Sequence, residues 1–514
     1  MSGTFDNLRL VAGFLLLSGC ASVDFDYPKP ESSVIVDTAD TFLGRALADA
    51  VAAKPEGHSG FIPIGDGIDA LAIRLLLAER AEVSIDAQYY LLKDGITGRA
   101  FVDSLLRAAD RGVRVRLLLD DMFTGGYDAG MVGLDSHPNI EIRIFNPFAR
   151  RSSRIMDGVT SFSRINRRMH NKSFTVDNQI TLIGGRNIAD EYFGAREDAK
   201  FGDLDVLAIG PIVRDISNMF DSYWAHERAA PTGAFADIPD DPAAELLGQR
   251  QLLEQSRQDV ANTIYAEAVN DHVLEYVETD SSAFIWATYT LAVDSPDKSI
   301  KSKAKTAPSI TTPLREALFS ANRELIIMSP YFVPGKNGIA FLADLQVRGI
   351  DVTVITNSLA ANNQATVHGG YAPSRKPLLK AGVRLLEVRP DAHVSGSEFM
   401  AASGAKATLH TKAFVVDRER SFIGSFNFDP RSAKINTELG VIIDSPEIAE
   451  ALASEIDANI AAQTYEVFLN ERGKLRWRAI DDGEELIYDK EPKTTWGQRF
   501  AAGFYRILPI RGQL

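Results

Sequence analysis

The stretch MHNKSFTVD at residues 169–177 encloses a short apolar run, SFTV, between His170, Lys172 and Asp177. The run is typical of a β-strand, in which residues two positions apart point to the same face, so the histidine and the lysine are expected to project together. A surface strand with polar ends would account for the pattern equally well. One occurrence does not separate a structural strand from a catalytic motif.

The same pattern occurs again at residues 409–417, LHTKAFVVD, where His410, Lys412 and Asp417 keep the spacing. The sequences downstream also correspond, since LIGGRN follows the first copy and FIGSFN the second. They align Gly184, Gly185 and Asn187 with Gly424, Ser425 and Asn427. A surface strand gives no reason for one spacing to occur twice with one downstream signature. We therefore interpret the two copies as parts of one functional site.

The segments before the two motifs repeat as well. AEVSIDAQYYLL (81–92) leads through a helical stretch to AADRGVRVRLLLDD (108–121), and NRELIIMSPYFV (322–333) leads in the same way to LQVRGIDVTVITNS (345–358). Apolar runs of about five residues suit strands that are buried on both faces of a sheet. The repeat therefore predicts an α/β fold with two copies of a largely parallel or mixed sheet, each flanked by helices.

Length and charge limit the class of protein. A chain of 514 residues with 45% hydrophobic and 24% charged residues is long enough for two fused, well-cored units of roughly 200 residues each. The net charge of −14 opposes binding to nucleic acid, so we expect no nucleic-acid partner. The predicted organisation is a signal peptide at 1–19, a tether at 20–60, lobe 1 at 61–235, a connection at 236–305, and lobe 2 with a C-terminal tail at 306–514.

The first twenty residues, MSGTFDNLRLVAGFLLLSGC, have the order of an export signal: Arg9, an apolar run from Leu10 to Leu17, then small residues before Cys20. The ending LSGC resembles the bacterial lipobox, in which the cysteine is acylated. A chance apolar N-terminus is the alternative. The lipobox interpretation predicts a membrane-anchored lipoprotein that faces the periplasm of a Gram-negative bacterium, and it leaves inner and outer membrane open.

Together, the paired motifs supply the groups that phosphate chemistry needs. Two lysines, two asparagines and the backbone donors of the glycine turns can hold a phosphate-sized anion. The two histidines can then serve as one nucleophile and one general acid. A metal centre is disfavoured, because the chain has no HExxH motif and its single cysteine forms no cluster. We expect neither metal nor cofactor, and the absence of G-x-S-x-G also argues against a serine hydrolase.

The paired H-x-K-x(4)-D motifs, each followed by G-G/S-x-N, resemble the signature of the phospholipase D superfamily. Three further stretches, FNPFARRSSRIMDGVTSFSRINRRMHNKSFTVD (145–177), SPYFVPGKNG (329–338) and HGGYAPSRKPLLKAGVRLLEVRP (368–390), are similar to its bacterial cardiolipin synthase C branch. The resemblance implies two phospholipase D-like lobes related by pseudo-twofold symmetry, with a single site between them. It also implies metal-independent phosphatidyl transfer through a covalent phosphohistidine.

By this resemblance His170 is expected to be the nucleophile and His410 the general acid and later base, although the symmetry leaves the reverse assignment open. The resemblance also implies that the motif lysines and asparagines hold the phosphate, and that Asp177 and Asp417 mainly brace the local structure. Aligning DLDVLAIG (203–210) with ELGVIIDS (438–445) pairs Asp203 with Glu438. We predict that these two carboxylates orient the imidazoles, with ordinary strand-edge acids as the alternative.

Three other features allow both a functional and a structural interpretation. His368, Tyr371 and Arg375 either line a headgroup pocket or pack a helix onto its lobe. The arginine clusters at 150–154 and 164–168 and the lysine-bearing loop at 295–306 either contact anionic lipid or are solvated. The aromatic and arginine residues of the last nineteen positions either contact the membrane or pack on the protein.

Four functions remain in competition at this point. The leading one is a phosphatidyltransferase that makes cardiolipin from phosphatidylglycerol and a second phospholipid, with phosphatidylethanolamine as the implied donor. A phospholipase D that hydrolyses its substrate to phosphatidic acid would use the same groups. A nuclease and a non-enzymatic binding module are the other two. We expect phospholipids and the membrane surface as partners, and one chain to supply a complete site, with no expectation for the oligomeric state.

Overall fold

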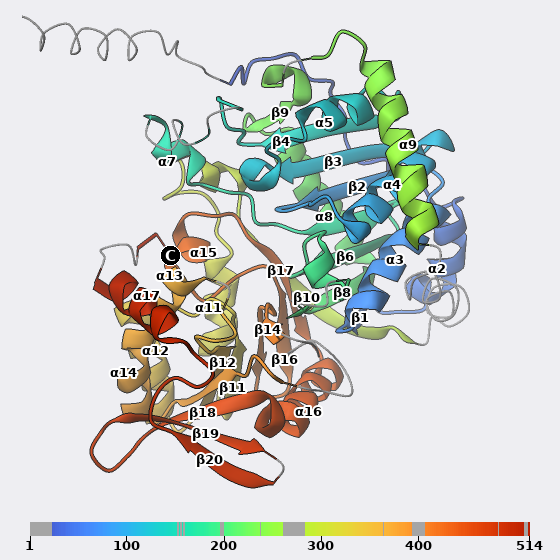
Figure 1. The fold of residues 1–514 in the computed structure, drawn as a ribbon. Helices are drawn as coiled ribbons and strands as arrows, with labels where there is room; N and C mark the ends of the chain where they lie inside the picture. The colour runs from blue at the N-terminus through green and yellow to red at the C-terminus, as the bar shows by residue number, and fades with distance from the viewer. Residues whose placement is uncertain are drawn as a thin grey trace, which may run out of the picture.

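The computed structural model of the chain describes residues 23–151, 154, 157, 160–195, 200–236, 238–260, 283–362, 364–392, 407–481, 483–507 and 512–513. The expected signal peptide and Cys20 lie outside these residues. The described chain forms two lobes, one coloured blue to green and the other yellow to red in Figure 1. The predicted two-lobed α/β fold is therefore confirmed.

Lobe 1 is built on a mixed sheet that carries the first motif. In spatial order its strands are β9 (Ala229–Pro231), β4 (Ile140–Phe145), β3 (Arg114–Asp120), β2 (Ser84–Tyr89), β5 (Ser173–Val176), β6 (Ile180–Gly184), β8 (Asp205–Ile209) and β1 (Ser59–Ile64). Strands β2, β3 and β4 are parallel, and α4 (Ile96–Asp110) connects the first two of them. The motif run SFTV is strand β5, at the centre of the sheet, and all four of its residues are buried.

Lobe 2 repeats this arrangement. Its strands are, in order, β20 (Glu484–Tyr488), β19 (Leu475–Asp481), β18 (Thr464–Leu469), β13 (Arg384–Val388), β12 (Asp351–Asn357), β11 (Glu324–Met328), β15 (Ala413–Val416), β16 (Arg420–Gly424) and β17 (Leu439–Asp444). Strands β11, β12 and β13 are parallel, with α12 (Gly335–Val347) between the first two. Strand β15, from the second motif, takes the central place that β5 has in lobe 1.

A single long strand, β10 (Ile285–Val293), joins the two sheets edge to edge. Its residues 285–287 pair with β1, and its residues 288–293 pair with β17. The stretch at 236–305, expected to connect the lobes, thus contains a strand of the sheet as well as α9 (Pro242–Val260), which packs against α4 and α5 (Asp128–Asp135) of lobe 1. From these pairings we propose β10 as the first strand of lobe 2.

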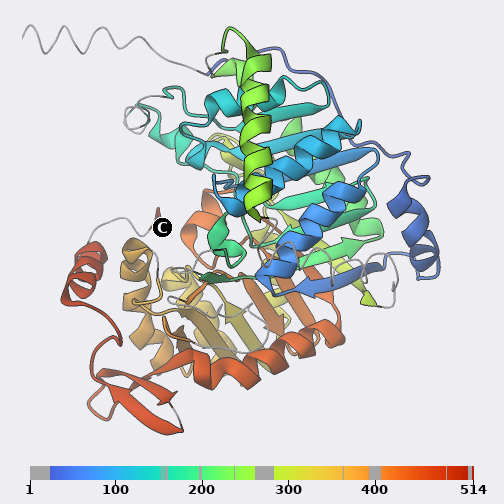
Figure 2. The same ribbon diagram turned by 45° about the vertical axis from the view of Figure 1, so that its right-hand side comes forward.

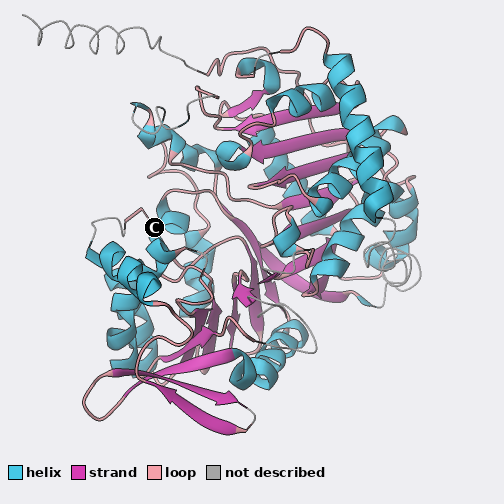
Figure 3. Cartoon of the chain, viewed as in Figure 1, coloured by secondary structure: helices cyan, strands magenta, loops and turns pink. Residues whose placement is uncertain are grey.

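Helices cover both faces of each sheet (Figure 3). In lobe 1, α3 (Gly67–Arg80) and α4 lie together on one face, α8 (Pro211–Trp224) packs on the other, and α9 lies across the outside, as Figure 2 shows. Helix α8 begins with Pro211 at its first turn, where the missing N–H costs nothing, and its buried residues recur at helical spacing. The other α-helices of the described residues are α2 (Phe42–Ala52), α7 (Phe162–Ile165), α11 (Thr311–Phe319), α13 (Ala365–Tyr371), α14 (Arg375–Lys380), α15 (Pro430–Lys434), α16 (Pro446–Gln463) and α17 (Trp496–Ile507).

The hydrophobic core is continuous across the boundary between the lobes. One buried cluster combines Val206 and Ile216 of lobe 1 with Val441 and Ile448 of lobe 2. Close-packed interiors of this kind hold the atoms on either side in fixed positions. The groups that each lobe contributes to the boundary are therefore held in a fixed relation. Among the described residues no helix is both long and apolar enough to span a bilayer.

The N-terminal part of the expected tether, from residue 23 on, is hydrogen-bonded to lobe 1. Lys29 donates to the carbonyl oxygens of His226 and Ala229, at 2.9 and 3.2 Å, and Trp224 donates to the Ser32 hydroxyl at 2.9 Å. The Ser32 carbonyl oxygen also accepts a bond from the buried Arg116. Composition alone indicated a loose linker, but buried arginines of lobe 1 need acceptors, and this segment supplies them.

Candidate active site

Each motif histidine is bonded to a carboxylate from the opposite lobe. His170 Nδ1 lies 2.8 Å from Glu438 Oε2, and His410 Nδ1 lies 2.5 Å from Asp203 Oδ2. All four groups are buried. A carboxylate on Nδ1 fixes the ring orientation and directs Nε2 toward the reacting group. The pairing expected from aligning the repeats is thus present, and neither lobe completes a histidine–carboxylate pair alone.

Backbone pairing between the lobes aligns these groups. Strand β7 (Lys200–Gly202) of lobe 1 pairs in parallel with β14 (Ala407–Leu409), and His410 N–H donates to the Gly202 carbonyl oxygen at 2.7 Å. On the other side of the pseudo-twofold axis His170 N–H donates to the Thr437 carbonyl oxygen at 2.9 Å. In each case the residue just before the histidine pairs with the residue just before the carboxylate of the other lobe. The same hydrogen-bonding device therefore places both pairs.

The lysines lie beside the histidines, as their spacing predicts. Lys172 Nζ donates to the His170 carbonyl oxygen at 2.6 Å. Lys412 Nζ contacts the His410 carbonyl oxygen and lies 3.2 Å from its Nε2. Both lysines are buried, so their charges are poorly solvated and available to an anion. Burial lowers the pKa of Lys172 well below its usual value and that of Lys412 to about 8, opposed by the carboxylates.

Gly185 and Ser425 occupy corresponding positions and suit carboxylates of different length. A Cβ at Gly185 would lie 2.0 Å from Asp203 Oδ1, so only glycine lets this short carboxylate reach its place. Ser425 instead donates its hydroxyl to Glu438 Oε2 at 2.5 Å, and Ser432 donates to Oε1 at 2.7 Å. The glycine–aspartate combination thus holds the imidazole of His410, and the serine–glutamate combination holds that of His170.

The two asparagines lie in the centre with part of each amide unpaired. Asn187 Nδ2 donates to the Tyr192 hydroxyl at 2.9 Å, and the Oδ1 atoms of Asn187 and Asn427 are buried without a hydrogen-bond partner among the described residues. Buried polar groups are usually paired, and the unpaired exceptions concentrate where a ligand binds. An amide Oδ1 accepts rather than donates, so these free atoms suit a donor group of a ligand, and the expected role of the two asparagines in holding a phosphate stays a prediction.

Aromatic residues that the motif analysis missed line the centre. The Tyr192 hydroxyl lies 3.4 Å from His410 Nε2, Phe201 stacks on the same imidazole with ring centroids 5.5 Å apart, and Tyr90 lies edge-on to His170 at 4.9 Å. The comparison of the repeats gave no signal for Tyr192, because the corresponding position of lobe 2 is Ser432. These rings exclude water around the imidazoles.

Asp177 and Asp417 do not reach the centre. Each stands beyond the far end of its motif strand, in the left-handed backbone region at φ of 50° and 56°. Asp177 accepts bonds from the N–H groups of residues 82–84, and Asp417 from those of residues 322–324. They anchor the start of β2 and β11 and contact neither imidazole, so the contacts support the bracing role that the resemblance implies.

We predict that Asp177→Ala lowers the free energy of unfolding by roughly 2–3 kcal/mol, because three N–H groups lose their acceptor. Urea unfolding followed by circular dichroism measures this loss. The folded fraction is expected to keep a turnover number within about twofold of the parent, and Asp177→Asn to be milder, since asparagine tolerates the left-handed conformation. A severe loss of turnover in fully folded Asp177→Asn protein would contradict a purely bracing role.

The free site holds both imidazoles neutral. Burial first, and then the nearby lysines, lower the pKa of His170 to about 4 and that of His410 to about 3 against the opposing carboxylates. The pKa of Asp203 and that of Glu438 lie below their usual values, because an imidazole and a lysine face each carboxylate. A neutral imidazole is the nucleophilic form. An entering phosphate adds negative charge and favours protonation of one imidazole.

Anion binding should therefore take up a proton. We predict that the dissociation constant of tungstate, a phosphate mimic, rises by up to about tenfold per pH unit between pH 5 and 7. The sign follows because the free imidazoles are neutral in this range, whereas one of them is protonated in the complex. Calorimetry in buffers of different ionisation enthalpy counts the proton directly. A dissociation constant that does not change with pH would show that neither imidazole is coupled to the anion.

Other residues indicated by the sequence have structural partners. His368 and Arg375 both contact Glu491, at 3.2 and 2.6 Å, and they are buried where α13 packs against α17, so the packing interpretation holds. Most of the clustered arginines are neutralised by ion pairs: Arg150 with Asp157, Arg151 and Arg154 with Asp121, and Arg168 with Asp120.

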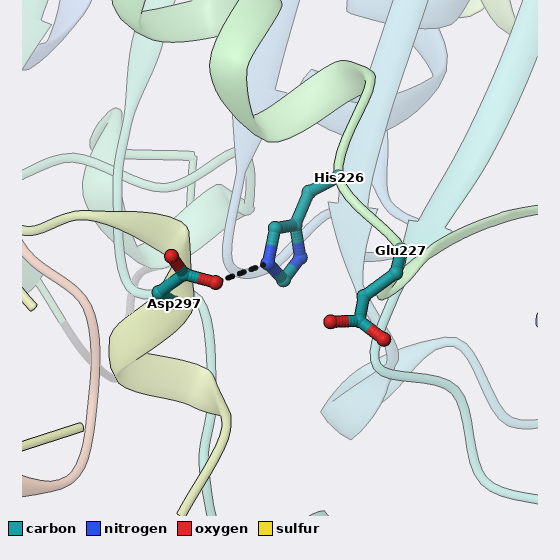
Figure 4. Close-up of side chains that lie close together, drawn as sticks. All are labelled: His226, Glu227 and Asp297. Atoms are coloured by element: carbon teal, nitrogen blue, oxygen red, sulfur yellow. Dashed lines mark hydrogen bonds and ion pairs between the residues drawn. The ribbon is translucent and has the colours of Figure 1, made fainter. Parts of the chain in front are cut away.

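One cluster outside the centre has the residue types of a metal site. His226, Glu227 and Asp297 lie together in Figure 4, with His226 Nε2 3.4 Å from Asp297 Oδ1. His226 Nδ1 accepts the Arg228 N–H, so Nε2 carries the proton and is not a free ligand atom. The Lys303 ammonium lies 3.1 Å from Glu227 and 3.0 Å from Asp297, in the place a cation would take. The Lys303 ammonium therefore supplies the positive charge that pairs with the two carboxylates of this cluster.

Paired histidines and lysines from two α/β lobes, meeting at one buried centre, define a protein of the phospholipase D type. The chain belongs to the family described as "Cardiolipin synthase, PLD-like domain", which matches residues 76–224 and 314–460. Cardiolipin synthase C of Escherichia coli (strain K12) is 40% identical over 470 residues, covering 90% of this chain and 98% of that protein.

Two further proteins are similar over most of their length. An uncharacterized protein of Helicobacter pylori (strain ATCC 700392 / 26695) is 32% identical over 507 residues, which cover 96% of this chain and 97% of that protein. The crystal structure of phosphatidylserine synthase from Haemophilus influenzae Rd KW20 has a TM-score of 0.53 at 14% identity, and the match covers 82% of this chain and 91% of that one. The second likeness concerns the fold.

Proposed function

We propose that this protein is a phosphatidyltransferase of the cardiolipin synthase type. The observation that carries the proposal is the pair of histidine–carboxylate contacts made across the lobes, His170 with Glu438 and His410 with Asp203. The 40% identity to cardiolipin synthase C of Escherichia coli over nearly the whole of both chains supports phospholipids as substrates. Phosphatidylethanolamine as donor and phosphatidylglycerol as acceptor are the pair that we propose.

The reaction proceeds in two displacements. In the first, His170 Nε2 attacks the phosphorus of the donor lipid, the bond to the headgroup oxygen breaks, and that oxygen takes a proton from His410. In the second, the acceptor hydroxyl loses its proton to His410 and attacks the same phosphorus, which releases His170 and forms the new phosphodiester. Lys172, Lys412 and the two asparagine amides stabilise the charge on the phosphoryl oxygens at both steps. Every proton and leaving group is handled by groups of this chain.

Exclusion of water favours transfer over hydrolysis. Tyr90, Tyr192 and Phe201 pack around the imidazoles, and both histidines are buried, so a charge is poorly solvated there. The accepting hydroxyl must therefore arrive on a lipid that fits the centre.

We also propose that the protein is associated with the membrane, and that acylation of Cys20 anchors it there. Mass spectrometry of the mature N-terminus would detect a lipidated Cys20, and an intact Met1 would refute the anchor.

Vesicles with defined lipids test the function. Purified enzyme mixed with phosphatidylethanolamine and phosphatidylglycerol is expected to form cardiolipin, identified by mass spectrometry, and to form much less when either lipid is omitted. Isotopic labelling of the phosphatidylethanolamine acyl chains shows which lipid donates the phosphatidyl group. Phosphatidic acid formed without cardiolipin would make the protein a hydrolytic phospholipase D instead.

A further inference from the structure

A cavity of about 660 Å³ outside the histidine centre collects positive charge. It opens between α7, the turn that follows α8, and the loop that follows residues 296–299, and its lining includes Arg164, Arg228, Lys301 and Lys305 together with Ser163 and Ser299. No carboxylate is found among the described residues of its wall. We refer to it as the cationic cavity, and none of its lining residues touches the imidazoles or their carboxylates.

The charges of the cationic cavity are only partly offset by carboxylates that lie outside its wall, Asp121 and Asp157 near Arg164 and Glu227 near Arg228. Among the described residues none of the four basic side chains forms an ion pair, whereas the neighbouring Lys303 is held by two carboxylates. Burial first, and then the charges of Arg168 and Arg228, lower the pKa of Arg164 to about 10. Arg164 donates one N–H group to Asn146 Oδ1 and the Pro147 carbonyl oxygen, at 3.0 and 2.6 Å, but these neutral acceptors do not cancel its charge. Four cations around one hollow repel one another, and a bound anion reduces this repulsion.

Two buried polar atoms at the cationic cavity also lack partners. Ser299 is only 2% exposed. Within the described part of the chain, neither its hydroxyl nor the buried Nε of Arg228 has a hydrogen-bond partner. A hydroxyl and a guanidinium N–H are both donors that suit phosphate oxygens. The cavity therefore offers directional donors as well as charge, which distinguishes a built site from a generally basic surface.

The N-terminal segment reaches this cavity. The guanidinium groups of Arg228 and Arg164 lie 4.7 and 5.7 Å from the ring of Phe25. Phe25 follows Cys20 by five residues, which span at most about 18 Å when extended. If Cys20 is acylated as proposed above, the cationic cavity lies within that reach of the bilayer surface. Phe162, next to Ser163 and 52% exposed, adds an apolar side chain on the same helix.

We propose that the cationic cavity binds the phosphate of an anionic phospholipid headgroup at the membrane surface, separately from the histidine centre. The lipid would hold lobe 1 against the membrane while the centre handles its own substrates. Binding is predicted to be independent of turnover, so it is measured on the full chain carrying His170→Ala, which consumes no lipid, and Cys20→Ser, which cannot be acylated.

Vesicle flotation tests the site. The protein is expected to float with phosphatidylcholine vesicles that contain one quarter phosphatidylglycerol, and hardly at all with pure phosphatidylcholine. Each lysine near an anionic surface contributes about fivefold to binding, so Lys301→Gln with Lys305→Gln should weaken it by roughly tenfold or more. Arg472→Gln with Lys474→Gln, which removes two exposed charges from the turn between β18 and β19, is the matched control and should change binding by less than about twofold.

Two further measurements separate a built lipid site from its alternatives. Ser299→Ala leaves the net charge unchanged and is expected to weaken binding about threefold through the lost hydroxyl donor. An equal loss in the Arg472 and Lys474 control, or no loss in Ser299→Ala, would show a diffuse charge effect and overturn the proposal. Inorganic phosphate that binds as tightly as the vesicles and displaces the protein from them would show a free-phosphate site and overturn the lipid assignment. Unchanged unfolding temperatures verify that the variants are folded.

Discussion

Replacing His170 by alanine is expected to lower the rate of cardiolipin formation by about four orders of magnitude or more, because the first bond to phosphorus then has no nucleophile. His410→Ala should be similarly severe with the natural donor, whose leaving oxygen needs a proton. A synthetic donor with a good leaving group, such as a nitrophenyl headgroup, needs no such proton. It should therefore rescue the first step of His410→Ala and leave His170→Ala inactive.

His58→Ala is the matched control for this experiment. His58 lies just before β1 and is half-buried. The one hydrogen-bond contact of its ring with a described residue is to the Glu56 carbonyl oxygen, at 3.4 Å. We expect this variant to keep turnover within about twofold of the parent. Rescue of His170→Ala, rather than of His410→Ala, by the activated donor would reverse the two roles. Retention of activity by both variants would exclude histidine chemistry altogether.

Glu438→Gln is expected to lower turnover by about 10³- to 10⁴-fold while the fold is retained. The carboxylate receives bonds from Ser425, Ser432 and the imidazole of His170. An amide of the same shape can present its NH₂ group to Nδ1, which favours the wrong tautomer, and it no longer stabilises a positively charged ring. The effect acts through a residue of the lobe opposite the nucleophile, so it measures the contact between the lobes.

Glu387→Gln separates this effect from the general cost of removing a buried charge. Glu387 is fully buried and pairs with Arg375 at 2.7 Å, away from the histidine centre. We expect Glu387→Gln to lower the unfolding temperature and to leave the turnover of the folded protein nearly unchanged. If Glu438→Gln behaved in the same way, the carboxylate would be a structural group, and the imidazole would be oriented by something else.

The parts of the site that could be predicted from the sequence are those that occur in both repeats. His170 and His410, Lys172 and Lys412 stand at the same spacing in each half, so a single internal comparison identified all four. The central strands β5 and β15 were predicted for the same reason, since each follows a motif lysine directly. Even the carboxylates Asp203 and Glu438 followed from aligning one strand of each repeat.

The parts of the site that could not be predicted from the sequence are of two kinds. Some occur in only one lobe, and others depend on contacts between residues that are far apart in the sequence. Tyr192 has a serine as its counterpart, so the repeat gave no signal for its contact with His410. The arginine clusters appeared to be a basic surface, because no pattern along the chain indicates that Arg151 meets Asp121 and Asp128. Arg164 belongs to the same run of sequence and yet has no carboxylate partner among the described residues. That difference exists only in three dimensions, and the cationic cavity depends on it.

Transfer of radiolabelled phosphorus from the donor lipid to the protein tests the phosphohistidine mechanism most directly. Briefly incubated with the activated donor and then denatured in alkali, His410→Ala protein is expected to carry label that is stable to base and labile to acid. Peptide mapping should place that label on His170, and the protein with both histidines replaced should carry none. Efficient lipid turnover with no label on His170 or His410 in any variant would contradict a covalent intermediate.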